Sequence, residues 1–217
     1  MTDYKEVLNR YADVDLDAMT EGEYRELKAA EMADMTYIAE GIRNSDVPEV
    51  MYRIGRPVTD LKMMMESGAD AYGYDKVLYH QIMPGDDHFT EFSYGRVRED
   101  VRGLGTSLLK LGLRGAHVGI IGNNCYEWAE SYFAVTGGVG VAVPLDKELS
   151  AEELANLVEM GDIKAVICCQ DKYYEILKEI RADRKNCLDI VIGVNREAHE
   201  NPRKGLYSWN LLREEGR

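Results

Sequence analysis

Basic residues are scarce in this sequence. Its 217 residues include 26 Lys or Arg against 39 Asp or Glu, which gives a formal net charge of -13. Nucleic acids and anionic lipid surfaces are bound through clustered positive charge, so this balance argues against both as partners. The imbalance is greatest in residues 1–50, with thirteen acidic and five basic side chains. We interpret that region as a solvated helical face in preference to an interaction tail.

Long apolar runs and an export signal are also missing. The longest mostly apolar stretch, Tyr132 to Leu145, contains three glycines and is shorter than the roughly 20 residues that span a bilayer. We therefore expect no transmembrane segment. The opening residues, Met1 to Glu6, lack the basic and apolar regions of a signal peptide, which favours a cytoplasmic location.

Cysteine and histidine are few, with four of each. The cysteines form no CxxC pair and are Cys125, Cys168, Cys169 and Cys187. Adjacent strand residues such as Cys168 and Cys169 point to opposite faces, and we expect reduced core thiols. The histidines show no metal-site or triad spacing and are His80, His88, His117 and His199. No metal ligand and no catalytic residue is therefore predicted.

The pattern changes character near residue 75 and again near residue 195. Residues 1–57 are predicted to be an acidic helical segment, in which Thr20 and Glu23 have the spacing of a capping box. A second, shorter helix is expected from Val58 to Met65, ended by Ser67-Gly68. Residues 196–217 are polar and are expected to form a short surface helix or a frayed end.

Residues 58–195 carry the pattern of an α/β unit. Strand formers flank the turn signal Pro84-Gly85-Asp86-Asp87, which predicts a β-hairpin. Apolar strands are then predicted at 117–121, 139–143, 165–168 and 188–192, with amphipathic helices between them. The expected fold is thus a parallel sheet of about four strands covered by helices, preceded by a β-hairpin and an N-terminal helical segment.

Three features invite a functional interpretation, each with a structural alternative. The loop Gly122-Asn123-Asn124 follows the first parallel strand, where ligands of such sheets bind, but either Asn could simply cap the next helix. Trp128 and Tyr132 lie four residues apart on one predicted helix face. They could form the wall of a hydrophobic pocket, or they could be ordinary core residues. Pro202-Arg203-Lys204-Gly205 lacks the Ser, Thr and Gly run of a phosphate loop, so we interpret it as a surface turn.

An ordered set of motifs resembles the N-terminal part of AMP-forming acyl-CoA synthetases. The motifs are Leu111-Gly112-Leu113-Arg114-Gly115 before a strand, Asn123-Asn124-Cys125-Tyr126-Glu127-Trp128, the run Gly137 to Asp146 with Pro144-Leu145-Asp146, and the helix from Ser150 leading to Lys164-Ala165-Val166-Ile167. The resemblance covers about residues 58–195. The Glu-Trp and Pro-Leu-Asp forms are most similar to long-chain fatty acid CoA ligases.

This resemblance implies a two-step reaction that uses ATP, Mg²⁺ and coenzyme A. A fatty acid or other carboxylate would form an acyl-adenylate, and coenzyme A would then displace AMP. In the family, the phosphate loop, the acidic ribose-binding residue and the lid with the catalytic Lys come later in the sequence. None has a counterpart here, so no catalytic, cofactor-binding or metal-binding residue is carried over. The resemblance places only Trp128 and Tyr132 near a site, the acyl pocket.

Two interpretations of the chain remain open. The first is a fragment of an acyl-CoA ligase, folded but inactive as a separate chain. The second is a non-catalytic binding or regulatory module derived from such a ligase, with the acidic first segment recruiting a partner. A sheet edge that the rest of a ligase would cover invites self-association, so a homodimer is expected.

Overall fold

The computed structural model describes residue 20 and residues 58–82, 87–183 and 187–217. Two compact units divide the chain after Lys76. The helix predicted to begin at Thr20, and almost all of the acidic segment 1–57, lie outside the described residues. The division of the chain at residues 57 and 195 therefore stays a prediction.

In the first unit the described structure is one helix, α4 (Leu61–Tyr72). Asp60 is its N-cap, and the Asp60 carboxylate accepts a hydrogen bond from the backbone N–H of Met63. The prediction that Ser67-Gly68 ends this helix is wrong. The Ser67 hydroxyl donates to the Met63 carbonyl within the helix, and the chain leaves the helix at Gly73, whose φ of 108° suits glycine.

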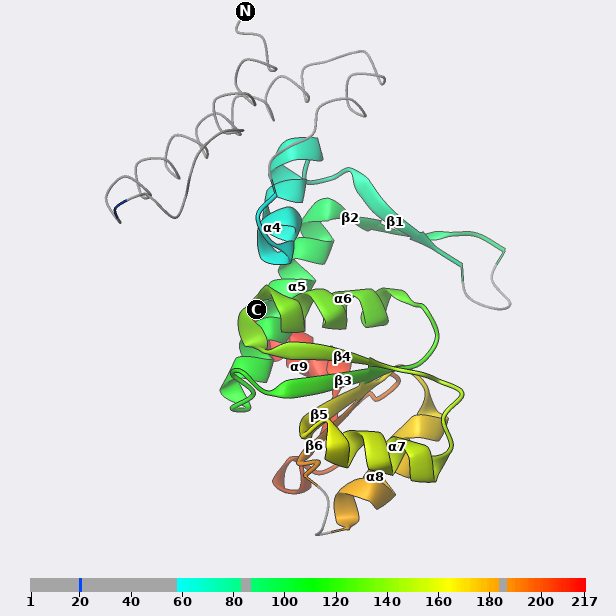
Figure 1. Ribbon diagram of the computed structural model, residues 1–217. Helices are drawn as coiled ribbons and strands as arrows, with labels where there is room; N and C mark the ends of the chain where they lie inside the picture. Colours follow the sequence, from blue (N-terminus) through cyan, green and yellow to red (C-terminus); the bar gives the residue numbers. More distant parts are fainter. Residues whose placement is uncertain (1–19, 21–57, 83–86, 184–186) are drawn as a thin grey trace, which may run out of the picture. The chain divides into compact units, whose positions relative to one another are not determined.

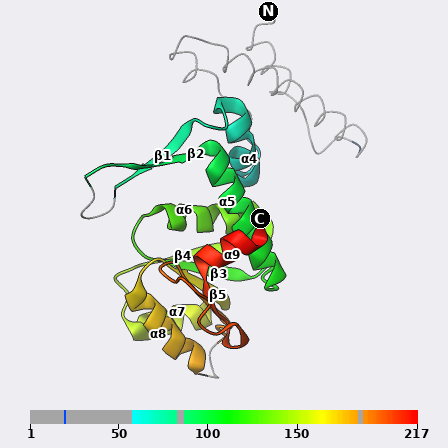
Figure 2. The ribbon, with the colours of Figure 1, turned by 180° about the vertical axis from the view of Figure 1, so that it is seen from behind.

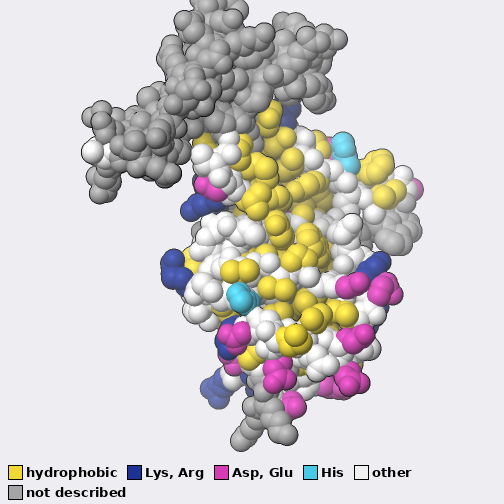
Figure 3. Space-filling view, viewed as in Figure 1, with side chains coloured by type: hydrophobic (Ala, Val, Ile, Leu, Met, Phe, Trp, Pro, Cys, Tyr) yellow, Lys and Arg dark blue, Asp and Glu magenta, His cyan; other side chains and the backbone are white. Residues whose placement is uncertain are grey.

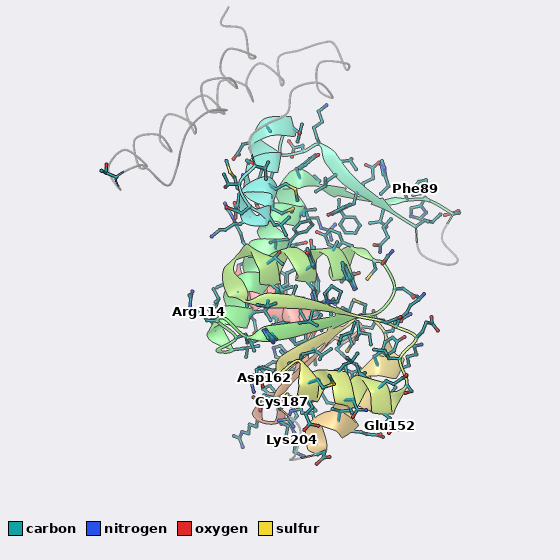
Figure 4. All side chains as sticks on the ribbon, in the orientation of Figure 1. Phe89, Arg114, Glu152, Asp162, Cys187 and Lys204 are labelled. Carbon is teal, nitrogen blue, oxygen red and sulfur yellow. The ribbon has the colours of Figure 1, made fainter. Side chains whose placement is uncertain are left out.

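The second unit begins with the predicted hairpin. Strand β1 (Val77–Gln81) pairs antiparallel with β2 (Thr90–Ser93). The predicted turn between them lies mostly outside the described residues. Phe89, just before β2, is 60% exposed and stands out from the hairpin (Figure 4).

Five parallel strands make the main sheet of this unit, one more than expected. In chain order they are β3 (His117–Ile121), β4 (Val141–Leu145), β5 (Ile163–Cys168), β6 (Ile190–Gly193) and β7 (Leu206–Ser208). Their order across the sheet is β4-β3-β5-β6-β7, and every neighbouring pair is parallel. The α/β class and the hairpin before the sheet are confirmed.

Helices cover both faces of the sheet (Figure 1). One face carries α5 (Tyr94–Lys110), α6 (Tyr126–Ala134) and α9 (Trp209–Gly216), and the other carries α7 (Ala151–Met160) and α8 (Asp171–Ala182). Cys169 belongs to the first core and Cys168 to the second, so these two cysteines do point to opposite faces. All four cysteines are free thiols.

The turn from α6 to β4 is built around glycine. A single π-helical turn (Val135–Val139) follows α6, and Gly138 within it has a φ of 128°. A side chain at Gly140 would overlap the backbone of Ala116, so only glycine allows the two chain segments to pack this closely. The strand predicted from residue 139 therefore begins two residues later, at Val141.

The C-terminal segment is neither frayed nor confined to the surface. A short 3₁₀ turn (Pro202–Lys204) leads into β7, which pairs with β6 and extends the sheet. Trp209 at the start of α9 is fully buried, and its indole N–H donates to the Ser131 hydroxyl at 2.9 Å. Figure 2 shows α9 lying against α5. Residues 196–217 thus complete the core, because Trp209 and Leu212 bury apolar surface between α5 and the sheet.

Candidate functional site

The carboxyl edge of the parallel sheet is the natural place for a ligand in this architecture. The loop Gly122-Asn123-Asn124 leaves β3 at this edge, as the sequence predicted. Neither asparagine caps the next helix, however. The N-cap of α6 is Cys125, without a side-chain capping bond, and the first amide of the helix, Tyr126 N–H, donates to Gln81 Oε1 from β1 at 2.6 Å. The hairpin therefore occupies the end of α6 that could have bound an anion.

The polar side chains at this edge are engaged with one another. Lys147, which follows β4, donates to Asn123 Oδ1 at 3.1 Å, and the Tyr173 hydroxyl donates to the Lys147 carbonyl. After β6, Arg196 forms ion pairs with Asp171 at 3.3 Å and with Glu175 at 3.5 Å. Its guanidinium also lies 4.1 Å from the centre of the Tyr174 ring. Lys147 and Arg196 are thus held by acidic, amide or aromatic partners of the chain itself.

The predicted aromatic pair lies on α6. The rings of Trp128 and Tyr132 are stacked, with centroids 5.7 Å apart and planes 6° from parallel. Both side chains are half-buried, and Trp128 packs against the core under α6. Figure 3 shows hydrophobic side chains spread over the region of α6 and β4, while acidic side chains gather around α7. Trp128 thus contributes to the core, and both rings keep part of their surface exposed.

A buried acidic cluster lies between α5, α6 and α9. Asp100 is fully buried and accepts a hydrogen bond from the Tyr126 hydroxyl at 2.9 Å. Arg213, Arg217 and Arg96 surround the same carboxylate, with Arg213 Nη1 at 3.5 Å and Arg96 Nε at 3.6 Å. The charge of Asp100 is therefore neutralised by arginines from both ends of the unit.

Glu130, in the same cluster, is not surrounded by arginines in this way. It is fully buried, and neither carboxyl oxygen has a hydrogen-bond partner within the described ranges. Burial, reinforced by the nearby charge of Asp100 and opposed by the Tyr126 hydroxyl and Arg213, raises the pKa of Glu130 to about 9. The same burial and the two carboxyl groups raise the pKa of the Tyr126 phenol. Glu130 is thus a neutral acid at neutral pH.

The spacing of both acids in the sequence already indicates core-facing positions. Asp100 lies three residues after Val97 and four before Leu104, on the apolar stripe of α5, and Glu130 lies four before Ala134 on the buried face of α6. A carboxylate at a core-facing helical position needs a buried partner. Its partners could not be named, because Arg213 and Arg217 lie more than a hundred residues further along the chain.

No described residue group has the composition of a metal centre, and the histidines lie apart. No set of three or more His, Cys, Asp or Glu in the part described could hold a metal ion. The histidines have separate surface partners: Glu91 for His80, Asp87 for His88, the Gly161 carbonyl for His117, and Glu215 for His199. The described helices include none with the length and apolar character needed to cross a membrane.

Comparison with known proteins identifies the family that the sequence matches. Residues 65–211 match the AMP-binding enzyme family. A crotonobetaine/carnitine–CoA ligase from Salmonella paratyphi B is 24% identical over 133 residues, which are 61% of this chain and 25% of that protein. The chain therefore spans about a quarter of the length of the curated relatives it matches.

Solved structures share the fold. A long-chain-fatty-acid-CoA ligase from Archaeoglobus fulgidus superposes with a TM-score of 0.63 at 17% identity, over 76% of this chain and 31% of that one. A coronafacic acid ligase from Pectobacterium brasiliense gives 0.58 at 19% identity, over 72% and 29%. The resemblance to acyl-CoA synthetases inferred from the motifs is thus confirmed. The family match extends over more than half of the sequence, from α4 into α9, and the chain belongs to the AMP-binding enzymes.

Proposed function

We propose that this chain is the N-terminal part of an ATP-dependent acyl-CoA ligase and is inactive as an isolated polypeptide. The complete enzyme would convert a carboxylate, ATP and coenzyme A into acyl-CoA, AMP and pyrophosphate. The observation that carries the proposal is the family match over residues 65–211, together with motifs typical of fatty acid CoA ligases. The relatives that match are themselves named as CoA ligases.

The described residues do not fit the phosphates of ATP. A phosphate site needs several free amides or hydroxyls beside a cation. The first amide of α6 is already bound by Gln81, and the first turn of α8 carries Asp171, whose charge repels an anion. Lys147 and Arg196 are engaged with side chains of the chain. The groups that hold ATP and Mg²⁺ would therefore come from other parts of the enzyme, and we assign no step to these residues.

The acyl chain is the substrate part that this piece can contact. The stacked rings of Trp128 and Tyr132 are half-buried on α6. Aromatic surface that is held rigid by core packing suits a fatty acyl chain, which is bound by burial of apolar area. We propose these two residues as one wall of the acyl pocket in the complete ligase.

A pyrophosphate-exchange assay tests the proposed inactivity. The purified chain is incubated with Mg·ATP, labelled pyrophosphate and a long-chain fatty acid, and label entering ATP is counted. We expect no exchange above the protein-free blank, because the described residues offer no phosphate cradle. A complete acyl-CoA ligase in the same buffer serves as positive control. Carboxylate-dependent exchange that co-purifies with this chain would show that the proposal is wrong.

A further inference from the structure

Two thiols lie together at the carboxyl edge of the sheet. Cys125 ends the loop after β3 and is the N-cap of α6, and Cys169 directly follows β5, the strand beside β3. The Cys169 N–H donates to the Ile121 carbonyl at 2.9 Å. A Cβ built on Gly122 would lie 2.8 Å from that of Cys169, so glycine lets the two chain segments come this close.

The two sulfur atoms have different surroundings. Cys125 is half-buried, and Cys169 is 8% exposed in the same core. The neighbouring Cys169 thiol lowers the pKa of Cys125, and burial opposes that shift. The Cys125 thiol, with burial, raises the pKa of Cys169. Of the pair, Cys125 is the more exposed thiol and the one whose pKa is lowered, so it is the more readily ionised of the two.

We propose that Cys125 and Cys169 form an oxidative modification site that closes to a disulfide when a hydroperoxide reacts with it. The Cys125 thiolate attacks the distal peroxide oxygen, the O–O bond breaks, and the products are a Cys125 sulfenic acid and hydroxide or alkoxide. The Cys169 sulfur then attacks the sulfenic sulfur. An S–S bond forms, the S–O bond breaks, and the Cys169 proton leaves with the hydroxyl as water. Two thiols lose two electrons, and the hydroperoxide takes them up.

The other two cysteines do not share this arrangement. Cys168 belongs to the opposite core and its thiol donates to the Ile192 carbonyl at 3.3 Å. Cys187 is half-buried, and its thiol donates to the Val158 carbonyl at 3.2 Å. Figure 4 shows Cys187 near Asp162, which precedes β5 at the amino end of the strands. Cys187 therefore offers a matched control of similar exposure at the other end of the sheet.

Oxidation would connect the loop after β3 to the end of β5. That loop holds Asn123 and begins α6, which carries Trp128 and Tyr132. A disulfide here would fix the carboxyl edge of the sheet without using the residues proposed for the acyl pocket. The site does not depend on ligase activity, so its test is independent of the proposed function.

Thiol counting and peptide mapping test the site. The chain is treated with a small excess of hydrogen peroxide and quenched, its free thiols are titrated, and its mass is measured. We expect four thiols to fall to two, a mass lower by about 2 Da, and a peptide linking Cys125 to Cys169. Before oxidation, iodoacetamide should modify Cys125 about tenfold faster than Cys187 at pH 7.

Three variants make the result decisive. Cys187→Ser should still form the disulfide, and Cys125→Ser should not. In Cys169→Ala, Cys125 should stop at the sulfenic acid or gain about 32 Da as the sulfinic acid, and its alkylation should slow to the rate of Cys187. Circular dichroism checks that each variant is folded. Retention of four thiols, a disulfide between other cysteines, or equal alkylation of Cys125 and Cys187 would overturn the proposal.

Discussion

Glu130 makes the stability of this protein depend on pH. Its pKa is raised from 4.5 to about 9 by burial and by the charge of Asp100. Between these values the unfolded chain loses the Glu130 proton while the folded chain keeps it, so the free energy of unfolding falls as the pH rises. Glu130 therefore weakens the fold most in mildly alkaline solution.

Replacing Glu130 with Gln should remove this pH dependence. The amide is neutral at every pH and close in shape to the protonated acid. We expect Glu130→Gln to be more stable than the parent at pH 8.5, with a gain that grows by about 1 kcal/mol per pH unit from pH 5.5 upward. Urea unfolding at four pH values measures the gain. A difference that stays constant with pH would contradict the assignment of a buried neutral acid.

Single residues also show what local patterns can and cannot predict. The Trp128–Tyr132 stack follows directly from i, i+4 spacing on a helix and was predictable. The partners of Asp100 and the contact between Cys125 and Cys169 were not, because each joins segments that are distant in the sequence. Helical spacing indicates which side chains share a face of a helix. Which residues pack against that face is known only from the folded structure.

Among the elements, the contact between α5 and α9 is the closest. A Cβ at Gly103 would overlap the Arg213 carbonyl, and Gly216 lies against the backbone of Gly103. The Ser107 hydroxyl donates to the Leu212 carbonyl at 2.6 Å. Two glycines thus let the helix backbones touch, and α9 in turn seals the core with Trp209.

Adding a methyl group at Gly103 should force α9 away from α5. We expect Gly103→Ala to lower the free energy of unfolding by about 2 kcal/mol, although alanine favours helix. Gly105→Ala, two residues further along, is the matched control. The nearest heavy atom to a Cβ there is the Ala134 carbonyl at 3.7 Å, so that variant should be neutral or slightly stabilised. Equal effects of the two substitutions in urea unfolding would contradict the close contact.

Elements with their own local signals were predicted well. The helix expected from Ser150 is α7, which Ser150 and Glu153 open with both hydrogen bonds of a capping box. Strand β7 was missed because three residues, Leu206 to Ser208, carry too little pattern, and their pairing with β6 is not local. Helix α4 ran past its expected end because Ser67 satisfies its hydroxyl on the preceding turn.

In the second unit, β4 is an edge strand of the five-stranded sheet. Val141 on this strand is 51% exposed, and within the part described no strand lies on its outer side. An apolar edge with free backbone groups can pair with another chain. We propose that two copies associate through β4, the homodimer expected from the sequence.

Light scattering on a size-exclusion column tests this association. We expect the mass to rise with concentration for the parent chain, and Val141→Lys to shift it toward the monomer, since a charge on the edge strand opposes pairing. Met160→Lys is the control, because Met160 is 83% exposed but lies on α7. A monomeric parent at all concentrations, or equal loss of association in both variants, would refute the β4 interface.

The proposed function has two parts: Trp128 and Tyr132 contact the acyl group, and the described residues hold no nucleotide. Titration of the ¹⁵N-labelled chain, followed by its amide and indole signals, tests it directly. Millimolar Mg·ATP should leave the signals of Asn123, Lys147 and Arg196 in place, whereas a medium-chain fatty acid should move the indole signal of Trp128 and spare that of buried Trp209. Two results would contradict the account. One is a saturable chemical-shift change at the carboxyl edge with Mg·ATP, and the other is a Trp128 indole signal that does not shift with fatty acid.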